Sequence, residues 1–239
     1  MRDAAAHGLG LRTFTVPGPA DGPVFVLLHG IGLSHREFTG LARELSATGR
    51  VVSFDLPGYG SSPRPRRQLT VQDHAALIGR QLDGLGPVVL VGHSMGAQFA
   101  VELARQSPWA VDRVVLVGPV VDIGKPTLRR QAAALLRDSP LEPPATQAMV
   151  VFDYLRCGIR WFLAQATAMR DYPTLRMVAE VTHPVLVVRG ADDPIADAAW
   201  CRLLARTAPH GRAISIAGRR HNVPHSDPLA TAAAILEFV

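Results

Sequence analysis

Short runs of aliphatic and β-branched residues recur along the chain, separated by segments with helical spacing of apolar positions. In chain order the runs are Val24–Leu28, Val51–Phe54, Val88–Val91, Val114–Val117, Val185–Val188 and Ala213–Ile216. Several are continuously apolar, which is typical of parallel strands buried on both faces. The alternation of strand and helix therefore predicts an α/β fold with a mostly parallel central sheet flanked by helices. Ligands of such sheets bind at the carboxyl ends of the strands.

Two of the predicted helices have recognisable starts. Ser34 is followed three residues later by Glu37, and Thr70 is followed by Asp73 at the same spacing. In a capping box the two side chains satisfy each other's free backbone N–H groups at the beginning of a helix. Both pairs are predicted to be capping boxes.

One interval breaks the alternation of strand and helix. Residues 119–181 contain helical patches and a proline-rich break from Pro140 to Pro144, but no clear strand pattern. We predict a helical lid (cap) inserted at 119–181 into a core formed by 1–118 and 182–239. The aromatic and Met residues of the insertion have two interpretations, as the buried face of its helices or as substrate contacts. The residues proposed here as substrate contacts are Tyr154, Trp161 and Phe162.

Composition favours one globular domain with one insertion. The chain has 239 residues, of which 48% are hydrophobic and 19% charged, so it can bury a full core. Its formal charge of +5 comes almost entirely from arginine, with Lys125 as the one lysine. The densest basic run, Arg64 to Arg67, has neighbouring prolines and no interleaved aromatic residues, which favours a solvated loop. No nucleic-acid partner is expected.

Targeting signals are not recognisable in the sequence. The start of the chain has no apolar core of a signal peptide, and no apolar run approaches the roughly 20 residues that span a bilayer. Cys157 and Cys201 match neither a paired redox motif nor a zinc-ligand spacing, which fits a reducing compartment. We therefore expect a cytoplasmic protein with no membrane partner. The oligomeric state is left open.

A candidate nucleophile follows the third predicted strand. Val88–Val91 leads directly into Gly92-His93-Ser94-Met95-Gly96, and a helical segment follows. A G-x-S-x-G sequence between a strand and a helix forms a sharp turn, in which the glycines relieve close contacts and the serine is held above the sheet edge. The strand before this motif and the helix after it, more than the motif itself, identify Ser94 as the nucleophile.

A serine nucleophile needs a neutral imidazole to take its proton and a carboxylate to orient that imidazole. Asp192 and Asp193 follow the strand Val185–Val188, and His221 follows Ala213–Ile216. The order Ser, Asp, His is one that α/β folds of this kind use. Asp193 is the preferred acid, while its neighbour Asp192 and Asp122, which follows an earlier strand, remain alternatives.

Several motifs together resemble the α/β-hydrolase-fold serine hydrolases over almost the whole chain. They are His29-Gly30-Ile31-Gly32, the segment Asp55-Leu56-Pro57-Gly58-Tyr59-Gly60-Ser61-Ser62, the G-x-S-x-G turn, and the acid and histidine turns. The resemblance implies that Asp193, three residues beyond Gly190, is the acid. It also implies that the backbone N–H groups of Ile31 and Met95 form the oxyanion hole, and that Asp55 is structural.

The remaining histidines of interest have other interpretations. His29 most simply supports the oxyanion loop, and it is also named as a candidate substrate contact. His93 occupies a variable position of the turn and is given no proton-transfer role. His221 and His225 have a metal-like spacing, but Pro224 interrupts any helix and no glutamate accompanies them. We expect no metal and no cofactor.

The predicted function is hydrolysis of an ester, thioester or similar carbonyl of a small-molecule substrate through an acyl-enzyme. Two alternatives remain from the sequence. One is hydrolysis of a carbon–carbon bond in a diketone, and the other is a non-hydrolytic relative, such as a cyclase, lyase, perhydrolase or receptor. Arg156 and Arg160 could hold a substrate carboxylate, although solvated side chains are the simpler interpretation.

Overall fold

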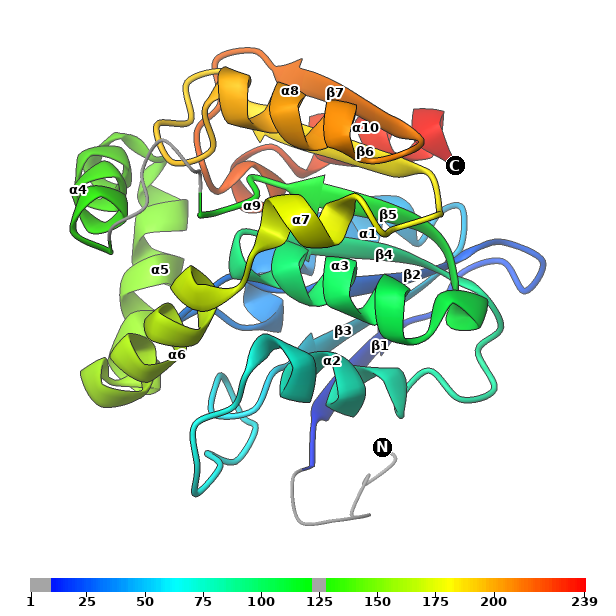
Figure 1. The fold of residues 1–239 in the computed structure, drawn as a ribbon, viewed down its shortest axis with the longest axis horizontal. Helices are drawn as coiled ribbons and strands as arrows, with labels where there is room; N and C mark the ends of the chain where they lie inside the picture. The colour runs from blue at the N-terminus through cyan, green and yellow to red at the C-terminus, as the bar shows by residue number, and fades with distance from the viewer. Residues whose placement is uncertain (1–9, 122–127) are drawn as a thin grey trace.

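The computed structural model describes residues 10–121 and 128–239 of the chain. Its strands are β1 (Arg12–Val16), β2 (Val24–Leu28), β3 (Arg50–Asp55), β4 (Val88–His93), β5 (Val111–Val117), β6 (Val185–Gly190) and β7 (Gly211–Ile216). They form one sheet in the order β1-β3-β2-β4-β5-β6-β7 (Figure 1). β1 is antiparallel to β3, and the other neighbouring strands are parallel. The predicted fold class is confirmed.

Helices cover both faces of the sheet. Before β5 they are α1 (Thr39–Leu45), α2 (Val71–Gly79) and α3 (Met95–Gln106), with the short 3-10 helices η1 (His35–Phe38) and η2 (Pro108–Ala110). After β6 they are α8 (Ala198–Thr207), α9 (Val223–Ser226) and α10 (Pro228–Phe238). α2, α3 and α8 lie on one face of the sheet, and α1 and α10 lie on the other (Figure 1).

The strand side chains alternate between two apolar cores. In β2, Val26 and Leu28 join the core beneath α2, α3 and α8, while Phe25 and Leu27 join the core beneath α1 and α10. Because successive side chains of a strand point to opposite faces, a continuously apolar strand supplies both cores. This explains why the central strands were recognisable from their sequence.

The sequence did not reveal β1. Its five residues, Arg12–Val16, are exposed or half-buried, and the strand lies at the edge of the sheet. An edge strand has one hydrogen-bonding edge without a partner strand, and its two faces are only partly covered by helices. It can therefore form with a weak apolar pattern. β1 therefore lacks the buried run that marks the central strands β2 to β6. The other edge strand, β7, has no buried residue either and was recognised from its apolar positions Ala213, Ile214 and Ile216.

The two predicted capping boxes have different outcomes. Thr70 and Asp73 form the complete box at the beginning of α2, which confirms that prediction. The prediction for Ser34 and Glu37 is wrong, because the Glu37 side chain turns inward and its Oε2 accepts the backbone N–H of Gly30 at 3.1 Å. Ser34 instead caps the short helix η1 and donates to Asp153 Oδ2 at 2.5 Å.

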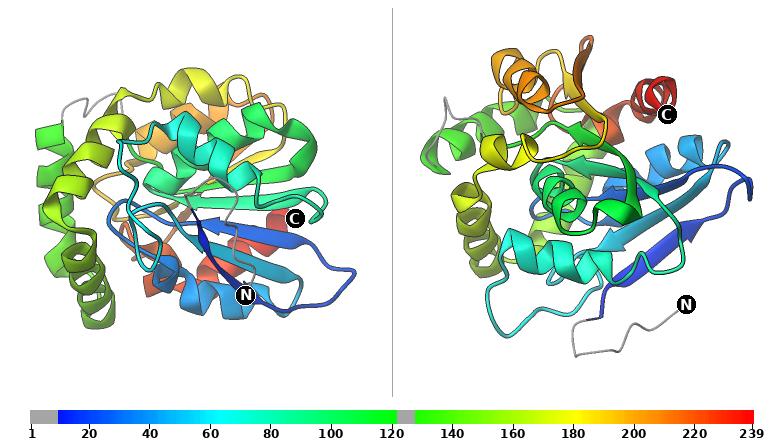
Figure 2. Two further views of the ribbon diagram at one scale, coloured as in Figure 1. Left: turned by 90° about the horizontal axis from the view of Figure 1, so that it is seen from below. Right: turned by 45° about the vertical axis from the view of Figure 1, so that its right-hand side comes forward.

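Between β5 and β6 the chain forms a helical insertion, defined here as residues 128–178. It contains α4 (Leu128–Asp138), η3 (Ser139–Leu141), α5 (Pro144–Cys157), α6 (Ile159–Asp171) and α7 (Thr174–Val178). α4, α5 and α6 lie together at one side of the sheet (Figures 1 and 2). Pro144 is the first residue of α5, where a missing backbone N–H is tolerated. The division of the chain into a core and a 119–181 lid stays a prediction.

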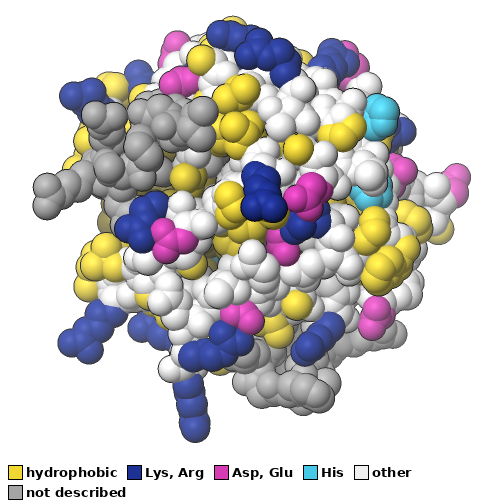
Figure 3. All heavy atoms as spheres, viewed as in Figure 1, with side chains coloured by type: hydrophobic (Ala, Val, Ile, Leu, Met, Phe, Trp, Pro, Cys, Tyr) yellow, Lys and Arg dark blue, Asp and Glu magenta, His cyan; other side chains and the backbone are white. Residues whose placement is uncertain are grey.

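Two surface properties bear on the expected partners. Among the helices that the structure describes, none is both long and apolar enough to cross a bilayer. On the face shown in Figure 3, the Arg side chains of the described residues are scattered among acidic and apolar ones and form no continuous stripe. Nucleic-acid binding proteins commonly present such a stripe.

Candidate active site

Ser94 lies in the sharp turn between β4 and α3. Its backbone has φ 53° and ψ −116°, which is an uncommon conformation for a residue with a side chain. The turn is possible because its neighbours are glycines. A Cβ at Gly92 would collide with the backbone of Gly96, and a Cβ at Gly96 would collide with the carbonyl oxygen of Leu28. The Ser94 N–H donates to Val117 O at 2.9 Å, which ties the turn to β5.

Asp193 lies in the turn that follows β6, and its side chain is buried. Its Oδ1 accepts the backbone N–H groups of Ile195 at 2.7 Å and Ala196 at 3.0 Å. Its Oδ2 lies 2.9 Å from His221 Nδ1. Burial acts to raise the pKa of Asp193, but the charge and hydrogen bond of His221 and the two N–H donors lower it overall. The carboxylate is thus fixed in position and ionised at neutral pH.

Arg189 supports this turn, and the sequence analysis did not identify it. Its guanidinium is buried and donates to the carbonyl oxygens of Ala196, at 2.8 Å, and Asp193, at 3.1 Å. These bonds cross the turn that carries the acid. The available signal was a charged residue at the end of an otherwise apolar strand.

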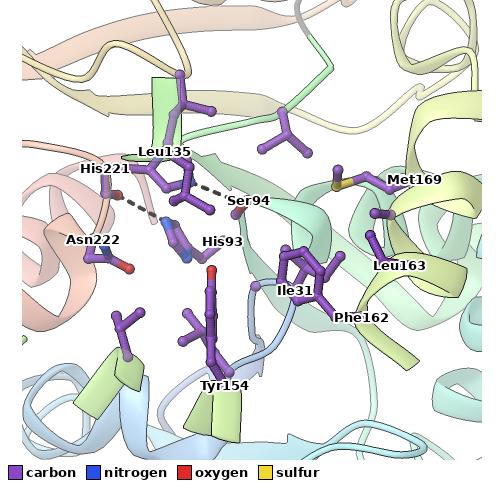
Figure 4. Close-up of a pocket in the computed structure, with 16 residues that line it drawn as sticks. Ile31, His93, Ser94, Leu135, Tyr154, Phe162, Leu163, Met169, His221 and Asn222 are labelled. Carbon is purple, nitrogen blue, oxygen red and sulfur yellow. Dashed lines mark hydrogen bonds between the residues drawn. The ribbon is translucent and has the colours of Figure 1, made fainter. Parts of the chain in front are cut away.

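His221 follows β7 and bridges the acid and the serine. Its Nε2 lies 3.1 Å from Ser94 Oγ, and its Nδ1 faces Asp193 (Figure 4). Burial acts to lower the pKa of His221, but the charge and hydrogen bond of Asp193 raise it above the usual value overall. With Nδ1 donating to the carboxylate, the neutral imidazole presents an unprotonated Nε2 to the serine hydroxyl.

The two alternative acids are placed differently. Asp192 is exposed, and the hydrogen bond to His221 is made by its neighbour Asp193. Asp122 lies outside the described residues. Among the predicted residues, the structure therefore brings Ser94, Asp193 and His221 into one hydrogen-bonded chain.

The candidate oxyanion donors lie on either side of the serine. Ile31 belongs to the loop after β2, and together with Gly30 it lines the cavity in front of Ser94. Met95 is the first residue of α3. The first N–H groups of a helix have no acceptor within the helix and attract negative charge. Both backbone positions are thus compatible with the predicted role.

His29 lies behind the oxyanion loop. Its Nε2 accepts the backbone N–H of Leu56 at 3.0 Å, so the proton of the neutral ring resides on Nδ1. Nδ1 then donates to Gly30 O at 2.8 Å. Burial lowers the pKa of His29, which favours this neutral form. His29 is not among the residues that line the cavity, so the prediction that it contacts substrate is replaced by a supporting position.

The carboxylate of Asp55 is occupied by its own loop. Oδ1 accepts from the backbone N–H of His35 at 2.9 Å and lies 2.7 Å from His35 Nδ1, while Oδ2 accepts from Ser61 N–H at 2.7 Å. Asp55 is buried, and none of these bonds involves His221. This arrangement agrees with the structural role expected for Asp55.

A cavity of about 130 Å³ opens in front of Ser94 (Figure 4). Apart from Ser94, the two histidines His93 and His221, and Asn222, its walls are mainly apolar. The apolar and aromatic lining residues are Ile31, Leu33, Val120, Leu135, Val150, Tyr154, Phe162, Leu163, Ala166, Met169 and Ile195. No arginine or lysine is among the described residues that line the cavity. The cavity is therefore suited to an uncharged, apolar group.

The predicted contacts from the insertion divide into two groups. Tyr154 and Phe162 line the cavity, and in Figure 4 the Tyr154 side chain points into it. Trp161 does not line it. The indole is 5% exposed and packs edge-on against Tyr59, with ring centroids 6.4 Å apart. Trp161 therefore belongs to the core, because neighbouring helical residues such as 161 and 162 point in different directions.

The insertion also contacts the loop that carries His221, which the sequence did not indicate. Glu142 Oε1 accepts the backbone N–H of Asn222 at 2.8 Å. Arg220 Nη1 lies 3.3 Å from Asp138 Oδ1. Burial raises the pKa of Asp138 to about 6, and the nearby Glu142 carboxylate acts in the same direction. The position of His221 thus depends partly on the insertion.

The metal-like spacing of His221 and His225 has a different explanation. The two nitrogens of His221 face Asp193 and Ser94, whereas His225 Nδ1 lies 2.9 Å from Thr146 Oγ1. The two imidazoles thus have separate partners. No cluster of three or more potential ligands (His, Cys, Asp, Glu) suited to a metal was found within residues 10–121 and 128–239.

Residues 25–234 match the model of a family described as the alpha/beta hydrolase family. The magnesium-chelatase 30 kDa subunit of Rhodobacter capsulatus is 37% identical over 134 residues, which are 52% of this chain and 46% of that protein. The chain thus spans about half the length of that relative.

Two further proteins match over most of their length. The (E)-2-((N-methylformamido)methylene)succinate hydrolase of Acinetobacter baylyi is 27% identical over 228 residues, covering 87% of each chain. The crystal structure of the enol-lactonase from Burkholderia xenovorans LB400 superposes with a TM-score of 0.84 at 21% identity, covering 99% of each chain. At that identity the structural match shows the fold alone.

Proposed function

The chain belongs to the alpha/beta hydrolase family, and we propose that it is a serine hydrolase that cleaves esters or thioesters of apolar carboxylic acids. The acyl group is transferred to Ser94 and then to water. The observation that carries this proposal is the hydrogen-bonded chain from Ser94 Oγ through His221 to Asp193, with distances of 3.1 and 2.9 Å. It supplies a nucleophile, a base and a group that orients the base, in contact with one another.

Acylation begins when Ser94 Oγ attacks the carbonyl carbon and its proton moves to His221 Nε2. The carbonyl oxygen becomes an oxyanion in a tetrahedral intermediate. The intermediate collapses when the bond to the leaving alcohol or thiol breaks, and His221 returns the proton to that group. Asp193 stays ionised and stabilises the imidazolium that exists between the two proton transfers.

Deacylation repeats these steps with water. His221 takes a proton from the attacking water molecule, a second tetrahedral intermediate forms, and the proton passes to Ser94 Oγ as the acid is released. We assign stabilisation of both oxyanions to the backbone N–H groups of Ile31 and Met95. Loss of one such donor typically costs about 10²- to 10³-fold in kcat.

The lining of the cavity supports an apolar acyl group and does not favour an acidic substrate. A substrate carboxylate is usually bound by arginine, because its planar fork matches the two oxygens. Arg156 instead donates to Gly60 O at 3.1 Å, Arg160 is exposed, and neither lines the cavity. We therefore do not extend the succinate-derived substrate of the Acinetobacter relative to this chain. A cytoplasmic location and a small-molecule substrate remain predictions.

The proposal is tested with a fluorophosphonate probe and nitrophenyl butyrate. We expect labelling of one site, with the added mass on the peptide that contains Ser94, together with hydrolysis of the ester. Ser94→Ala should lose both and retain the circular dichroism of the wild type. Ser61→Ala, which alters an exposed serine in the loop after β3, is the matched control and should retain both.

Two outcomes would contradict the proposal. If Ser94→Ala kept a tenth of the wild-type rate, Ser94 would not be the nucleophile. If Ser94 were labelled but neither esters nor thioesters were turned over, the carbon–carbon hydrolase or non-hydrolytic alternatives would be favoured. These alternatives use the same three side chains, so ester turnover is the measurement that separates them.

A further inference from the structure

A second, larger cavity lies on the outer side of the helical insertion. Its volume is about 870 Å³, and it is bounded by α4, η3, α5 and α6. We call it the outer groove. Its lining residues are Leu135, Leu136, Ser139, Pro140, Glu142, Gln147, Val150, Val151, Tyr154, Leu155, Gly158, Ile159, Phe162 and Asn222. Most of these side chains are apolar, and within the part of the chain that the structure describes no arginine or lysine lines the groove.

One stripe of α5 follows the outer groove. Gln147, Val150, Val151, Tyr154 and Leu155 all line it, at positions i, i+3, i+4, i+7 and i+8 of the helix. Residues with this spacing share one face of a helix. An apolar stripe of this kind usually packs against another element, but here it borders a cavity.

The opposite side of α5 is held by the core. Asp153 accepts from Ser34 Oγ at 2.5 Å and from Arg36 Nη1 at 2.9 Å. The Arg36 guanidinium also lies over the Phe152 ring, 4.7 Å from its centroid. These contacts fix the rotation of α5 about its axis, so its apolar stripe is directed towards the outer groove.

Several lining residues are strongly exposed. The exposed fractions are 79% for Leu155, 73% for Leu136, 69% for Ile159 and 58% for Val151. Single exposed apolar residues are normal, but a group of them around one cavity typically marks a binding site. A ligand that covered these side chains would gain the free energy of removing their apolar surface from water.

The outer groove adjoins the catalytic cavity. Leu135, Val150, Tyr154, Phe162 and Asn222 line both of them. The catalytic cavity is about 130 Å³, and a cavity of about 150 Å³ accommodates a molecule the size of benzene. An acyl chain of more than a few carbons therefore extends beyond the catalytic cavity, and the apolar space that adjoins the cavity at these five residues is the outer groove.

We propose that the outer groove binds the distal part of a long, uncharged aliphatic acyl chain whose carbonyl lies at Ser94. This inference rests on the proposed function and narrows its substrate to long-chain esters or thioesters. Among the described residues that line the groove, Glu142 carries the one ionisable carboxylate and none is a cation, which suits an uncharged distal end of the acyl chain. Glu142 itself is engaged by Asn222.

The test compares nitrophenyl acetate with nitrophenyl dodecanoate, both below the concentration at which the long ester forms micelles. Leu155→Asn and Ile159→Asn replace apolar groups in the outer groove that do not line the catalytic cavity. Each should lower the ratio of kcat/KM for dodecanoate to that for acetate by about tenfold. Leu229→Asn, at an exposed leucine of α10, is the matched control and should leave the ratio unchanged.

A binding measurement keeps this test separate from the test of the proposed function. In the Ser94→Ala background, the affinity for intact nitrophenyl dodecanoate should fall with Leu155→Asn and Ile159→Asn, and not with Leu229→Asn. If Leu155→Asn and Ile159→Asn changed neither the affinity for the ester nor the ratio of kcat/KM values, the proposal that the outer groove binds the acyl chain would be overturned, even if Ser94 were the nucleophile. If the groove variants bound the ester more weakly but the wild type did not hydrolyse it, the proposed chemistry would be contradicted. The assignment of the outer groove as a binding site would still hold.

Other occupants would also be recognised. If the groove variants dissociated a dimer in light scattering while the ratio stayed constant, the surface would be an interface between copies of the chain. If they abolished sedimentation with phosphatidylcholine vesicles while the ratio stayed constant, it would be a lipid-binding face. Either result would overturn the proposal.

Discussion

The carboxylate of Glu37 lies in direct contact with Nδ1 of His93, and both side chains are almost completely buried. Burial acts to raise the pKa of Glu37, but the charge and hydrogen bond of His93 lower it overall. The other oxygen of Glu37 accepts the N–H of Gly30, and His93 Nε2 donates to the carbonyl oxygen of His221 at 2.9 Å. The pair therefore connects the oxyanion loop to the backbone of the proposed base.

This connection predicts strong coupling between the two side chains. Glu37→Gln or His93→Gln alone should each lower the free energy of unfolding by about 3 kcal/mol, because each leaves a buried partner uncompensated. In the double variant, the two amides can replace the bonds to Gly30 and His221 without a buried charge. Its loss should therefore be smaller than the sum of the single losses in urea unfolding. Additive losses would show that the two residues act independently.

The identity of the acid is tested by a pair of neighbouring substitutions. Asp193→Asn keeps the shape of the side chain but removes the charge that orients His221, so kcat should fall by about 10⁴-fold. Asp192→Asn changes the exposed neighbour in the same turn and should have little effect. Ester hydrolysis by the two purified variants measures this difference. Near-normal turnover by Asp193→Asn would return the assignment to Asp122, which is tested in the same way.

The pH dependence of kcat/KM should report on His221. The imidazole acts as a base only when it is unprotonated, and its pKa in the free enzyme is raised above 6.5 by Asp193. The rate should therefore increase with pH and reach half its maximum above pH 6.5. In the residual activity of Asp193→Asn, burial would act without the opposing carboxylate, so the midpoint should move to lower pH. A midpoint that did not move, or moved upward, would exclude this pairing.

Asp138 should destabilise the fold as it ionises. The pKa of this carboxyl is raised from 3.8 to about 6 in the folded chain, chiefly by burial. A raised folded pKa means that its contribution to stability is fully present below about pH 4 and is lost as the pH rises through about 6. Relative to Asp138→Asn, the wild type should thus lose about 1 kcal/mol between pH 4 and pH 7, allowing for solvent screening and for Arg220.

Urea unfolding of both proteins across this pH range gives the measurement for Asp138. Only the difference between wild type and variant matters, because other groups titrate equally in both. A difference that stayed constant with pH would mean that Asp138 keeps an ordinary pKa in the folded chain.

Adjacent aromatic residues in α6 should behave differently. Trp161 packs in the core, so Trp161→Ala should lower the free energy of unfolding by about 3 to 5 kcal/mol. Phe162 lines both cavities, so Phe162→Ala should mainly change the preference between short and long esters. Thermal unfolding and chain-length profiles of the two variants check this. Equal effects on specificity would contradict the placement of Trp161.

Much of the framework was predictable because its signals are local. The buried strands carry continuous apolar runs, and the turn at Ser94 requires glycines at fixed positions. The turns after β6 and β7 present Asp193 and His221 at the same edge of a parallel sheet, since the carboxyl ends of parallel strands meet there. Strand order along the chain was therefore enough to predict that these side chains would meet.

Glu37 shows where local patterns mislead. Its spacing from Ser34 fits a capping box, but its carboxylate is directed to Gly30 and His93. Glu37 is itself buried and pairs with the buried N–H of Gly30 and the imidazole of His93, because a buried carboxylate gains most from charged and hydrogen-bonded partners. The sequence alone shows the spacing between Ser34 and Glu37, but it does not show which groups compete for the Glu37 carboxylate in the folded chain.

By itself, the sequence determined the parallel strands of the sheet, the turn that holds the serine, and the order of the three polar side chains. The tertiary structure decided which residues surround them. Asp138 meets Arg220 across 82 residues of chain, and Glu142 meets Asn222 across 80. It also decided that Phe162 faces the cavities while Trp161 faces the core. Such choices depend on how the insertion is rotated and packed against the core, and no periodicity within the chain specifies a contact between distant segments.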